Sequence, residues 1–239
     1  MAHPLQKQFQ AQVEEIVLAS VRAASLGYVS SHGGNLSMRV AEDIVLITPT
    51  KVPKRDITGE DICFVNMRGE TIYAPEGRKP TSESPFHLRV YAKRPDLRGI
   101  VHAHPPVLTG FAIAGGDLLR RPFLPEPVIE IGPMILVPYA QPGSEALAVA
   151  FDAALPYSNG FLMENHGVLM TNCEGVLRAL DLLEMMECAA KSVLVAQSLG
   201  NLKPLAKRDV DDLEQTMVAR GLPMPGDPSL NRSLKDVFM

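Results

Sequence analysis

Two histidines separated by one residue, His102 and His104, are the most informative residues for chemistry. The apolar residues before them predict a strand over residues 99–104, and side chains i and i+2 of a strand project to the same face. Two imidazoles on one face can bind a single divalent cation. His166 follows another apolar segment at a glycine-containing break, from which it could reach the same ion. Three histidines with an open position are typical of a catalytic rather than a structural metal site.

A carboxylate flanked by hydroxyl groups lies at the expected start of a helix. Thr81, Ser82 and Glu83 precede residues 84–93, where apolar side chains recur at helical spacing before Pro95. Taken alone, Glu83 is explained by the helix dipole, which favours a carboxylate there by about 0.3 to 1 kcal/mol. The same helix end offers free N–H groups and two hydroxyls to a bound phosphate or carboxylate.

Two further polar loops could contribute to an anion site. The pair Gly33-Gly34 would let backbone N–H groups approach a ligand, and Asn35 adds an amide. Thr50 and Lys51, after a strand-like segment, add a hydroxyl and a cation. A glycine pair alone more often marks a tight turn. Three such loops together with the histidines indicate a site for a small anionic substrate.

The remaining histidines are less informative. His87 lies on the face of the helix predicted over residues 84–93, where a packed or capping role is expected. His32, beside the glycine pair, is either a turn residue or a substrate contact. His3 lies close to the N-terminus.

The elements that must position these residues alternate between helix and strand. Helical periodicity predicts helices over residues 6–26, 84–93, 107–113, 144–154 with Ser144 as N-cap, 174–199 and 210–220. Short apolar segments predict strands over 36–40, 44–48, 62–65, 71–73, 99–104, 128–131, 135–137 and 160–163. Several strand connections are too short for a parallel crossover. We therefore expect a three-layer α/β/α fold with a mixed, largely antiparallel central sheet.

Length and composition indicate one domain over residues 1–239, ending in a helical tail. With 239 residues, 46% of them hydrophobic, the chain can bury about 70% of its unfolded surface and needs no structural metal or disulfide. Cys63, Cys173 and Cys188 lack any CxxC spacing, which argues against a disulfide framework or a cysteine zinc site and favours a reducing compartment.

Charge and hydropathy exclude two classes of partner. The net charge of −4 provides no electrostatic footprint for nucleic acid or an anionic membrane. No apolar run approaches the ~18 to 20 residues that span a bilayer, and the N-terminus has no secretory apolar region. A cytoplasmic protein without nucleic-acid or membrane partners is expected.

The motifs at residues 34–37, 47–50, 81–83, 101–104 and 165–167 together resemble the class II aldolase/adducin family over about residues 8–200. The resemblance implies a mixed sheet between helical layers, a C4 homotetramer with active sites at subunit interfaces, and one divalent ion per subunit. Zinc is expected first, although manganese, cobalt or iron suit the same donors. His102, His104 and His166 match the family's metal-binding histidines, and Glu83 matches its metal ligand and general acid/base. Asn35, Thr50, Thr81 and Ser82 match positions that contact the substrate phosphate. Gly34 and Lys51, their neighbours in the same loops, are also expected to bind the substrate.

The activity implied is that of a metal-dependent carbon–carbon lyase. The primary expectation is an aldolase that cleaves a ketose 1-phosphate, similar to fuculose 1-phosphate, to dihydroxyacetone phosphate and an aldehyde through a metal-bound enediolate. The family's epimerases typically have Asp at the position of Glu83, which favours lyase chemistry here.

Departures from the family pattern leave an alternative open. Phe123 or Leu124, and Arg220, stand where family aldolases have two tyrosines, and Lys51 stands where the phosphate loop usually has glycine. A metal-dependent decarboxylase of a hydroxylated aromatic or heteroaromatic dicarboxylate needs no aldehyde-protonating tyrosine, and Lys51 or Arg220 could pair with its carboxylate. A non-catalytic adducin-like module is disfavoured, because a scaffold has no need for three histidines and Glu83 together.

Overall fold

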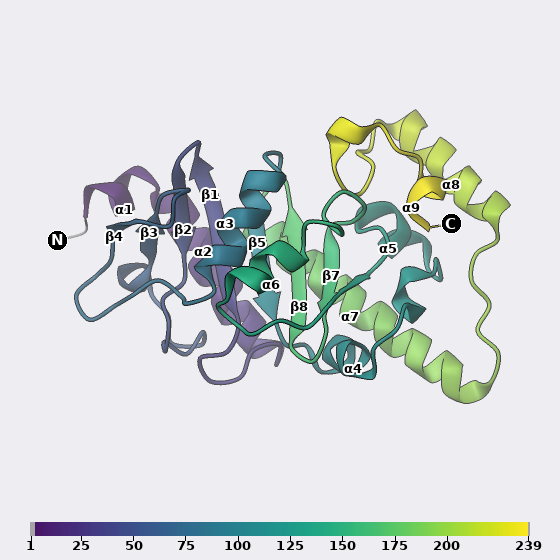
Figure 1. Ribbon diagram of the computed structural model, residues 1–239, viewed down its shortest axis with the longest axis horizontal. Coiled ribbons are helices and arrows are strands. Elements are labelled where there is room, and N and C mark those ends of the chain that lie inside the picture. The colour runs from purple at the N-terminus through teal and green to yellow at the C-terminus, as the bar shows by residue number, and fades with distance from the viewer. Residues whose placement is uncertain (1–2, 239) are drawn as a thin grey trace.

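The computed structural model describes residues 3–238 and has an eight-stranded sheet at its centre (Figure 1). The strands lie in the order β4-β3-β2-β1-β5-β8-β7-β6. Their bounds are β1 Asn35–Ala41, β2 Ile44–Ile47, β3 Cys63–Val65, β4 Thr71–Tyr73, β5 Gly99–Ala103, β6 Ile135–Val137, β7 Gly160–Met163 and β8 Gly167–Asn172. Within the described residues, β6 and β7 are parallel and the other neighbours antiparallel. The mixed, largely antiparallel sheet is confirmed.

Helices cover both faces of this sheet. Their bounds are α1 Pro4–Gln8, α2 Gln10–Ser25, α3 Ser84–Lys93, α4 Pro106–Ala114, α5 Pro125–Glu130, α6 Glu145–Ala150, α7 Val176–Leu199, α8 Lys207–Arg220 and α9 Leu234–Phe238, with 3-10 turns at Gly59–Asp61, Leu118–Arg120 and Pro228–Leu230. Core residues of α2, α4 and α7 pack on one face, and those of α3 and α6 on the other. The predicted three-layer α/β/α architecture is confirmed.

The alternation of side chains along β5 determines which helical layer His102 faces. Val101 and Ala103 are buried against α2 and α7, whereas Ile100 is buried against α3 and α6. His102 shares the parity of Ile100, so it projects toward the α3 side. Its ring packs edge-on against Phe86 of α3, with ring centroids 5.6 Å apart.

The strand predicted over residues 128–131 is wrong, because this segment forms α5. Pro125 and Pro127, which precede this segment, have no backbone N–H to donate to a β-ladder, but the first turn of a helix tolerates both. Val128 and Ile131, three residues apart, are 2% and 0% exposed, which is the inward spacing of a helix. The sequence predicts correctly that these residues are apolar and buried, but it predicts the spacing of a strand where the structure has that of a helix.

Two predicted helices have different boundaries, and one further helix was not predicted. The helix predicted over residues 6–26 is interrupted at Phe9, where φ is −112° and ψ is 34°, and so forms α1 and α2. The helix predicted over 144–154 ends at Ala150, although its N-cap is confirmed: Ser144 Oγ accepts from Leu147 N at 3.2 Å. α9, in the proline-rich tail, was not predicted.

β8 was not predicted, although it is central to the sheet. All six of its residues are buried between β5 and β7. The strand begins immediately after the histidine-containing turn and ends in Thr171 and Asn172, so its sequence has neither clean alternation nor a fully apolar run. Within residues 3–238, no helix is long and apolar enough to cross a membrane.

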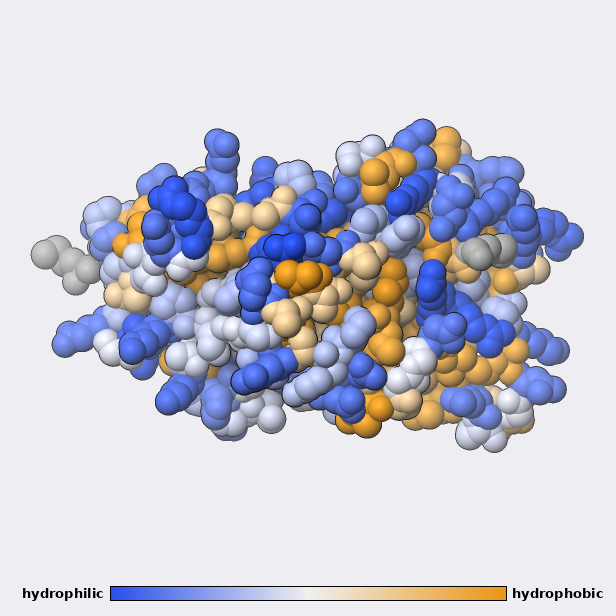
Figure 2. Space-filling model, viewed as in Figure 1, coloured by the Kyte–Doolittle hydropathy of each residue, from blue (hydrophilic) through white to orange (hydrophobic). Residues whose placement is uncertain are grey.

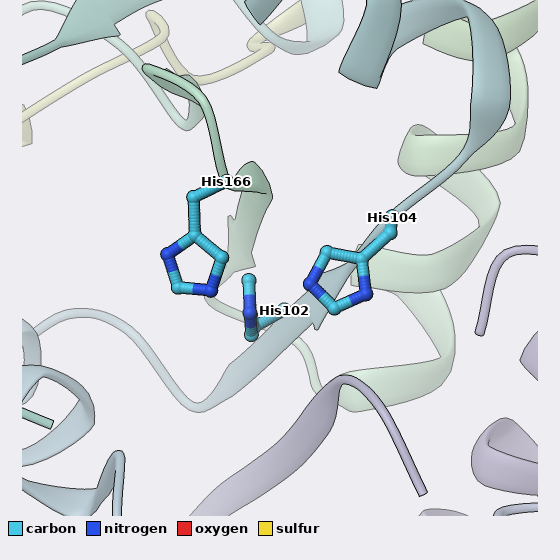
Figure 3. Close-up of side chains that lie close together, drawn as sticks. All are labelled: His102, His104 and His166. Carbon is cyan, nitrogen blue, oxygen red and sulfur yellow. The ribbon is translucent and has the colours of Figure 1, made fainter. Parts of the chain in front are cut away.

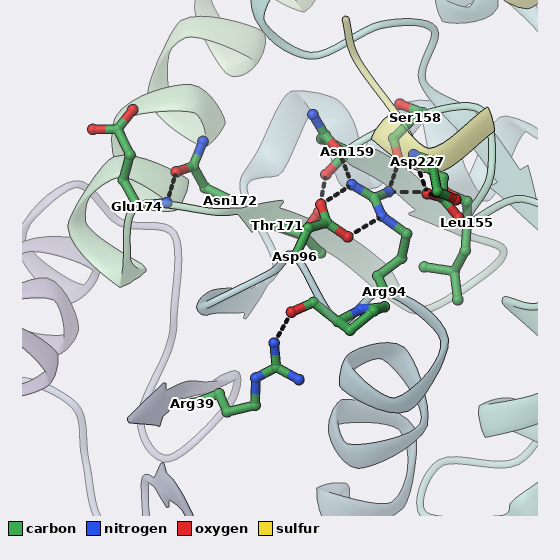
Figure 4. Close-up of polar contacts among 12 residues, drawn as sticks. Arg39, Arg94, Asp96, Leu155, Ser158, Asn159, Thr171, Asn172, Glu174 and Asp227 are labelled. Atoms are coloured by element: carbon green, nitrogen blue, oxygen red, sulfur yellow. Dashed lines mark hydrogen bonds and ion pairs between the residues drawn. The ribbon is translucent and has the colours of Figure 1, made fainter. Parts of the chain in front are cut away.

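A buried arginine links the end of α3 to the loop before β7 (Figure 4). Arg94 is 2% exposed, its Nε donates to Asp96 Oδ1 at 2.9 Å, and its Nη1 donates to the Leu155 carbonyl at 2.9 Å. Its Nη2 also donates to Asn159 Oδ1 at 3.1 Å. The guanidinium therefore holds together segments that are distant in sequence.

We predict that Arg94→Met lowers the free energy of unfolding by about 3 to 5 kcal/mol, because it leaves the partners of a buried charge unsatisfied. Arg68→Met is the matched control: Arg68 pairs with Glu70 at 3.0 Å while both side chains are mostly exposed. Because solvent screens this exposed pair, Arg68→Met should leave the unfolding midpoint close to that of the wild type. Urea unfolding measures both variants, and equal midpoints would contradict the structural role given to Arg94.

Candidate active site

Three histidines meet at one end of the sheet (Figure 3). His102 lies in β5, His104 follows that strand directly, and His166 lies in the turn between β7 and β8. One ligating atom of each lies within 4.8 Å of the others. Asn165 bends this turn with a left-handed φ of 52°, and β8 then pairs with β5, which brings the two histidine segments side by side. The predicted juxtaposition of the three histidines is present.

Two glycines allow His104 to occupy its place. A Cβ at Gly167 would lie 2.5 Å from His104 Cδ2, and one at Gly33 would lie 3.4 Å from His104 Nδ1. The side chain therefore packs directly on bare backbone at Gly167 and closely at Gly33. At Gly34, a Cβ would lie 2.7 Å from the carbonyl oxygen of His102. In the structure, these glycines make room for the histidine segment.

The carboxylate of Glu83 faces the histidine cluster from the start of α3. Glu83 Oε2 lies 3.4 Å from His102 Nε2, and Oε1 lies 3.5 Å from His166 Nε2. Asn35 Nδ2 donates to Glu83 Oε2 at 2.7 Å. Glu83 is only 9% exposed. Four groups able to bind a cation thus converge from three separate chain segments.

Several of these polar atoms lack partners among the described residues. His102 Nε2, His166 Nδ1 and Glu83 Oε1 are buried and accept or donate no hydrogen bond there. An unpaired buried polar group is costly. A divalent cation held by the three histidines and Glu83 would give His102 Nε2 and Glu83 Oε1 a partner.

Burial keeps the histidines in the neutral form that binds metal. It lowers the pKa of His102 well below its ordinary value, with further contributions from His104 and His166, and it lowers the pKa of His104 to about 4. Burial also lowers the pKa of His166, although Glu83 acts in the opposite direction. His102 Nδ1 donates to the Val168 carbonyl at 3.0 Å, which leaves Nε2 as a lone-pair donor. Three imidazoles and one carboxylate fit a divalent ion such as zinc.

Backbone hydrogen bonds join the three loops predicted to bind an anion. Thr81 N donates to the Thr48 carbonyl at 3.2 Å, and Thr50 N donates to the Lys79 carbonyl at 2.9 Å. Leu36 N donates to Thr48 Oγ1 at 3.1 Å. The loops that carry Asn35, Thr50 and Thr81 therefore form one connected surface beside the histidines.

The side chains of these loops differ in access. Lys51 and Ser82 are exposed, Thr50 is half-buried, and Thr81 is buried. Lys51 has a φ of 60°, a left-handed conformation that glycine adopts without strain. The lysine thus keeps the backbone geometry expected of a glycine while adding a cation.

Phe123, Leu124 and Arg220, at the positions compared with the family's tyrosines, are not part of the histidine cluster. Phe123 and Leu124 line a small apolar cavity with Met186 and Val193 of α7. Arg220 is exposed at the end of α8. None of these three side chains carries a hydroxyl group.

Lys54 is a buried cation that sequence reasoning missed. It is 1% exposed, and its Nζ lies 3.3 Å from the Val52 carbonyl and 3.5 Å from the His32 carbonyl. Burial lowers its pKa to about 8. The ammonium thus connects the loop before β1, which contains His32, with the loop after β2, which contains Val52. A lone lysine in a polar loop gives no sequence signal for burial.

We predict that Lys54→Met stabilises the protein near pH 7 and that the gain disappears in base. Its pKa falls from 10.5 unfolded to about 8 folded, so the folded state binds fewer protons between those values. The full penalty, up to about 3 kcal/mol, acts below pH 8 and is relieved as pH approaches 10.5. Lys51→Met, at an exposed position, is the control. A difference in unfolding free energy that does not shrink between pH 8 and 10 would contradict this assignment.

A layered α/β/α domain with three histidines and a carboxylate at one end of its sheet defines a divalent-metal enzyme. Residues 14–194 match the family model described as Class II Aldolase and Adducin N-terminal domain. The chain therefore belongs to the class II aldolase and adducin family.

Individual relatives narrow the class of reaction. The chain is 33% identical over 191 residues to 3-oxo-tetronate 4-phosphate decarboxylase of Haemophilus influenzae, covering 79% of this chain and 89% of the relative. It is 31% identical over 203 residues to L-fuculose phosphate aldolase of the same species, covering 82% and 88%. The crystal structure of YgbL from Klebsiella pneumoniae, described as an aldolase, epimerase or decarboxylase, has a TM-score of 0.77 at 31% identity, covering 85% and 98%.

Both curated relatives cleave carbon–carbon bonds, and the chain is accordingly a metal-dependent lyase of this family. Similarity to a decarboxylase favours the alternative drawn from the sequence over the primary expectation of an aldolase. The relative's substrate, however, is an aliphatic oxo acid phosphate, not an aromatic dicarboxylate.

Proposed function

We propose that this chain is a divalent-metal-dependent decarboxylase of a phosphorylated 3-oxo acid of the 3-oxo-tetronate 4-phosphate type. One observation carries the proposal. The three clustered histidines, Glu83 and the hydroxyl-bearing loops are all present, whereas Phe123 or Leu124 and Arg220 stand at the positions of the two tyrosines expected of an aldolase. Similarity to a decarboxylase of that name supports the same choice.

The chemistry of such a substrate explains why no tyrosine is needed. When the bond between C1 and C2 breaks, carbon dioxide leaves and the electron pair remains on C2, conjugated with the C3 carbonyl. A proton added to C2 then gives dihydroxyacetone phosphate. A divalent ion, when bound, supplies positive charge that stabilises the developing oxyanion. Because no aldehyde is formed, no group is required to protonate an aldehyde oxygen.

The chain's own residues provide binding and proton transfer. Thr50, Lys51, Thr81 and Ser82 are proposed to bind the phosphate, since their loops are joined beside the histidines. Glu83 is proposed to give a proton to C2 and to recover one from solvent, which balances the reaction. The contacts of Glu83 with Asn35, His102 and His166 support this role.

The resident ion and the assembly belong to the same proposal. We propose zinc, because three imidazoles and a carboxylate suit its preferred ligands. We also propose a homotetramer. Apolar surface gathers over α4, α5 and α7 (Figure 2), and Leu194, Val195 and Leu199 of α7 are 49%, 57% and 83% exposed. An exposed apolar surface of this kind is typical of an interface.

An aldolase that cleaves a ketose 1-phosphate is the second candidate, because Glu83 is retained and one relative is an L-fuculose phosphate aldolase. A direct comparison of substrates separates the two. The zinc-loaded protein is expected to decarboxylate 3-oxo-tetronate 4-phosphate with a kcat/KM at least about 100-fold above that for cleavage of fuculose 1-phosphate. The opposite order would establish the aldolase and reject the decarboxylase.

A further inference from the structure

A continuous chain of buried hydrogen bonds leads from Glu83 into the layer between β1 and α3. His87 Nε2 lies 2.5 Å from Asn35 Oδ1, and His87 Nδ1 lies 2.7 Å from Ser37 Oγ. Ser37 Oγ lies 3.0 Å from the hydroxyl of Tyr91. His87, Ser37 and Tyr91 are 0% exposed, and Asn35 is 4% exposed. Water therefore cannot substitute freely for any member.

The spacing of these residues explains how the chain forms. Asn35 and Ser37 are two residues apart on β1 and project to one face, while His87 and Tyr91 are four apart on one side of α3. The two elements face each other across the layer. His87 was expected to be a packed or capping residue. It is packed, but both of its ring nitrogens also have specific partners.

The hydrogen bond between Asn35 and Glu83, at one end of this series of hydrogen bonds, indicates where the protons lie. The carboxylate of Glu83 accepts from Asn35 Nδ2, so Asn35 Oδ1 must face His87 and can only accept. His87 Nε2 therefore carries a proton. Burial lowers the pKa of His87 to about 3, so the ring is neutral and Nδ1 is an acceptor. The Ser37 hydroxyl donates to Nδ1, and the hydroxyl of Tyr91, beyond Ser37, donates to the Arg98 carbonyl at 3.2 Å.

We propose that His87 is a positioning residue for proton transfer: its Nε2–H tautomer fixes the amide of Asn35 with the NH₂ group toward Glu83. The proposal rests on the proposed function only in that Glu83 moves the proton. If the amide were reversed, Asn35 Oδ1 would face Glu83 Oε2 at 2.7 Å with no hydrogen between them. That repulsion would turn the carboxylate away from His102 and His166.

Two substitutions of His87 separate positioning from packing. His87→Gln keeps an amide N–H near the position of Nε2, whereas the shorter side chain in His87→Asn places its amide near Nδ1. We expect His87→Gln to retain activity within about 10-fold and His87→Asn to lose about 100-fold or more in kcat, with little change in KM. Tyr91→Phe, at the far end, should have a small effect because Ser37 still donates to His87.

The activity readout is the exchange of a hydroxymethyl proton of dihydroxyacetone phosphate with deuterium oxide, followed by proton NMR. Decarboxylase and aldolase chemistry share this step, so the test does not depend on which substrate the enzyme prefers. Equal losses in His87→Gln and His87→Asn, matched by equal losses of thermal stability, would overturn the positioning role.

A measurement on the unmodified protein keeps the proposal testable if a variant fails to fold. Nitrogen-15 NMR of the labelled wild-type protein at pH 7 reports the tautomer of each histidine. We expect His87 to be neutral and protonated at Nε2. A ring protonated at Nδ1, or at both nitrogens, would overturn the proposal even in a fully active enzyme. The expected tautomer without decarboxylation would reject only the proposed function.

Discussion

Replacing His104 with alanine is expected to remove bound metal and abolish turnover. His104 supplies one of only three imidazoles in the cluster, and it is held between the bare backbone of Gly33 and Gly167, so no neighbouring side chain can take its place. Loss of a direct ligand should weaken metal binding by more than the roughly 10- to 100-fold typical of mutating a residue that only hydrogen-bonds to a ligand. Elemental analysis after dialysis, together with the decarboxylation rate, measures both effects.

His32→Ala is the matched control for this prediction. His32 is exposed, and its Nδ1 lies within hydrogen-bonding distance of Ser31 Oγ, at 3.2 Å. It lies outside the cluster of three histidines. The control should keep a full complement of metal, even if substrate affinity changes. A His104→Ala protein with unchanged metal content and rate would show that the three histidines do not form the metal site.

Replacing Glu83 with glutamine is expected to preserve metal and abolish most proton transfer. Glutamine is close in size and can still accept from Asn35, while the three histidines remain. Removing a general acid or base typically costs about 10²- to 10⁴-fold in rate. Steady-state kinetics with the zinc content measured on the same sample tests the prediction.

Glu164→Gln provides the control. Glu164 lies two residues before His166, and within residues 3–238 its carboxylate accepts only from the backbone N–H of Tyr139, at 2.9 Å. An amide oxygen can accept that bond equally well. The Glu164→Gln variant should keep a decarboxylation rate near that of the wild type. If Glu83→Gln retained a near-normal rate with metal bound, the proton donor would have to be another group.

Part of the histidine cluster could be predicted from the sequence, because two local rules act there. Alternation along β5 places His102 on the face opposite Ala103, and His104 continues the same parity beyond the strand. The turn after β7 could be placed from Gly167 and the apolar residues before it. That His166 reaches the same point depends on the pairing of β8 with β5, which no local pattern encodes.

Other features depend on tertiary contacts and could not be predicted. The role of His87 requires β1 and α3 to face each other, and the burial of Lys54 requires two loops to close over it. The α5 segment is predicted as a strand because short apolar segments fit either period, although Pro125 and Pro127 favour the helix that forms. Local patterns identified the residue types in the site, while their partners depended on the assembled fold.

The central claim is tested most directly by following one turnover in deuterium oxide. The zinc-loaded protein is given 3-oxo-tetronate 4-phosphate labelled with carbon-13 at C1, and NMR follows the released label and the product together. We expect labelled carbon dioxide and bicarbonate to appear at the same rate as dihydroxyacetone phosphate bearing one deuterium on its hydroxymethyl carbon. Intact labelled substrate, under conditions where the same protein cleaves a ketose 1-phosphate to an aldehyde, would contradict the decarboxylase assignment.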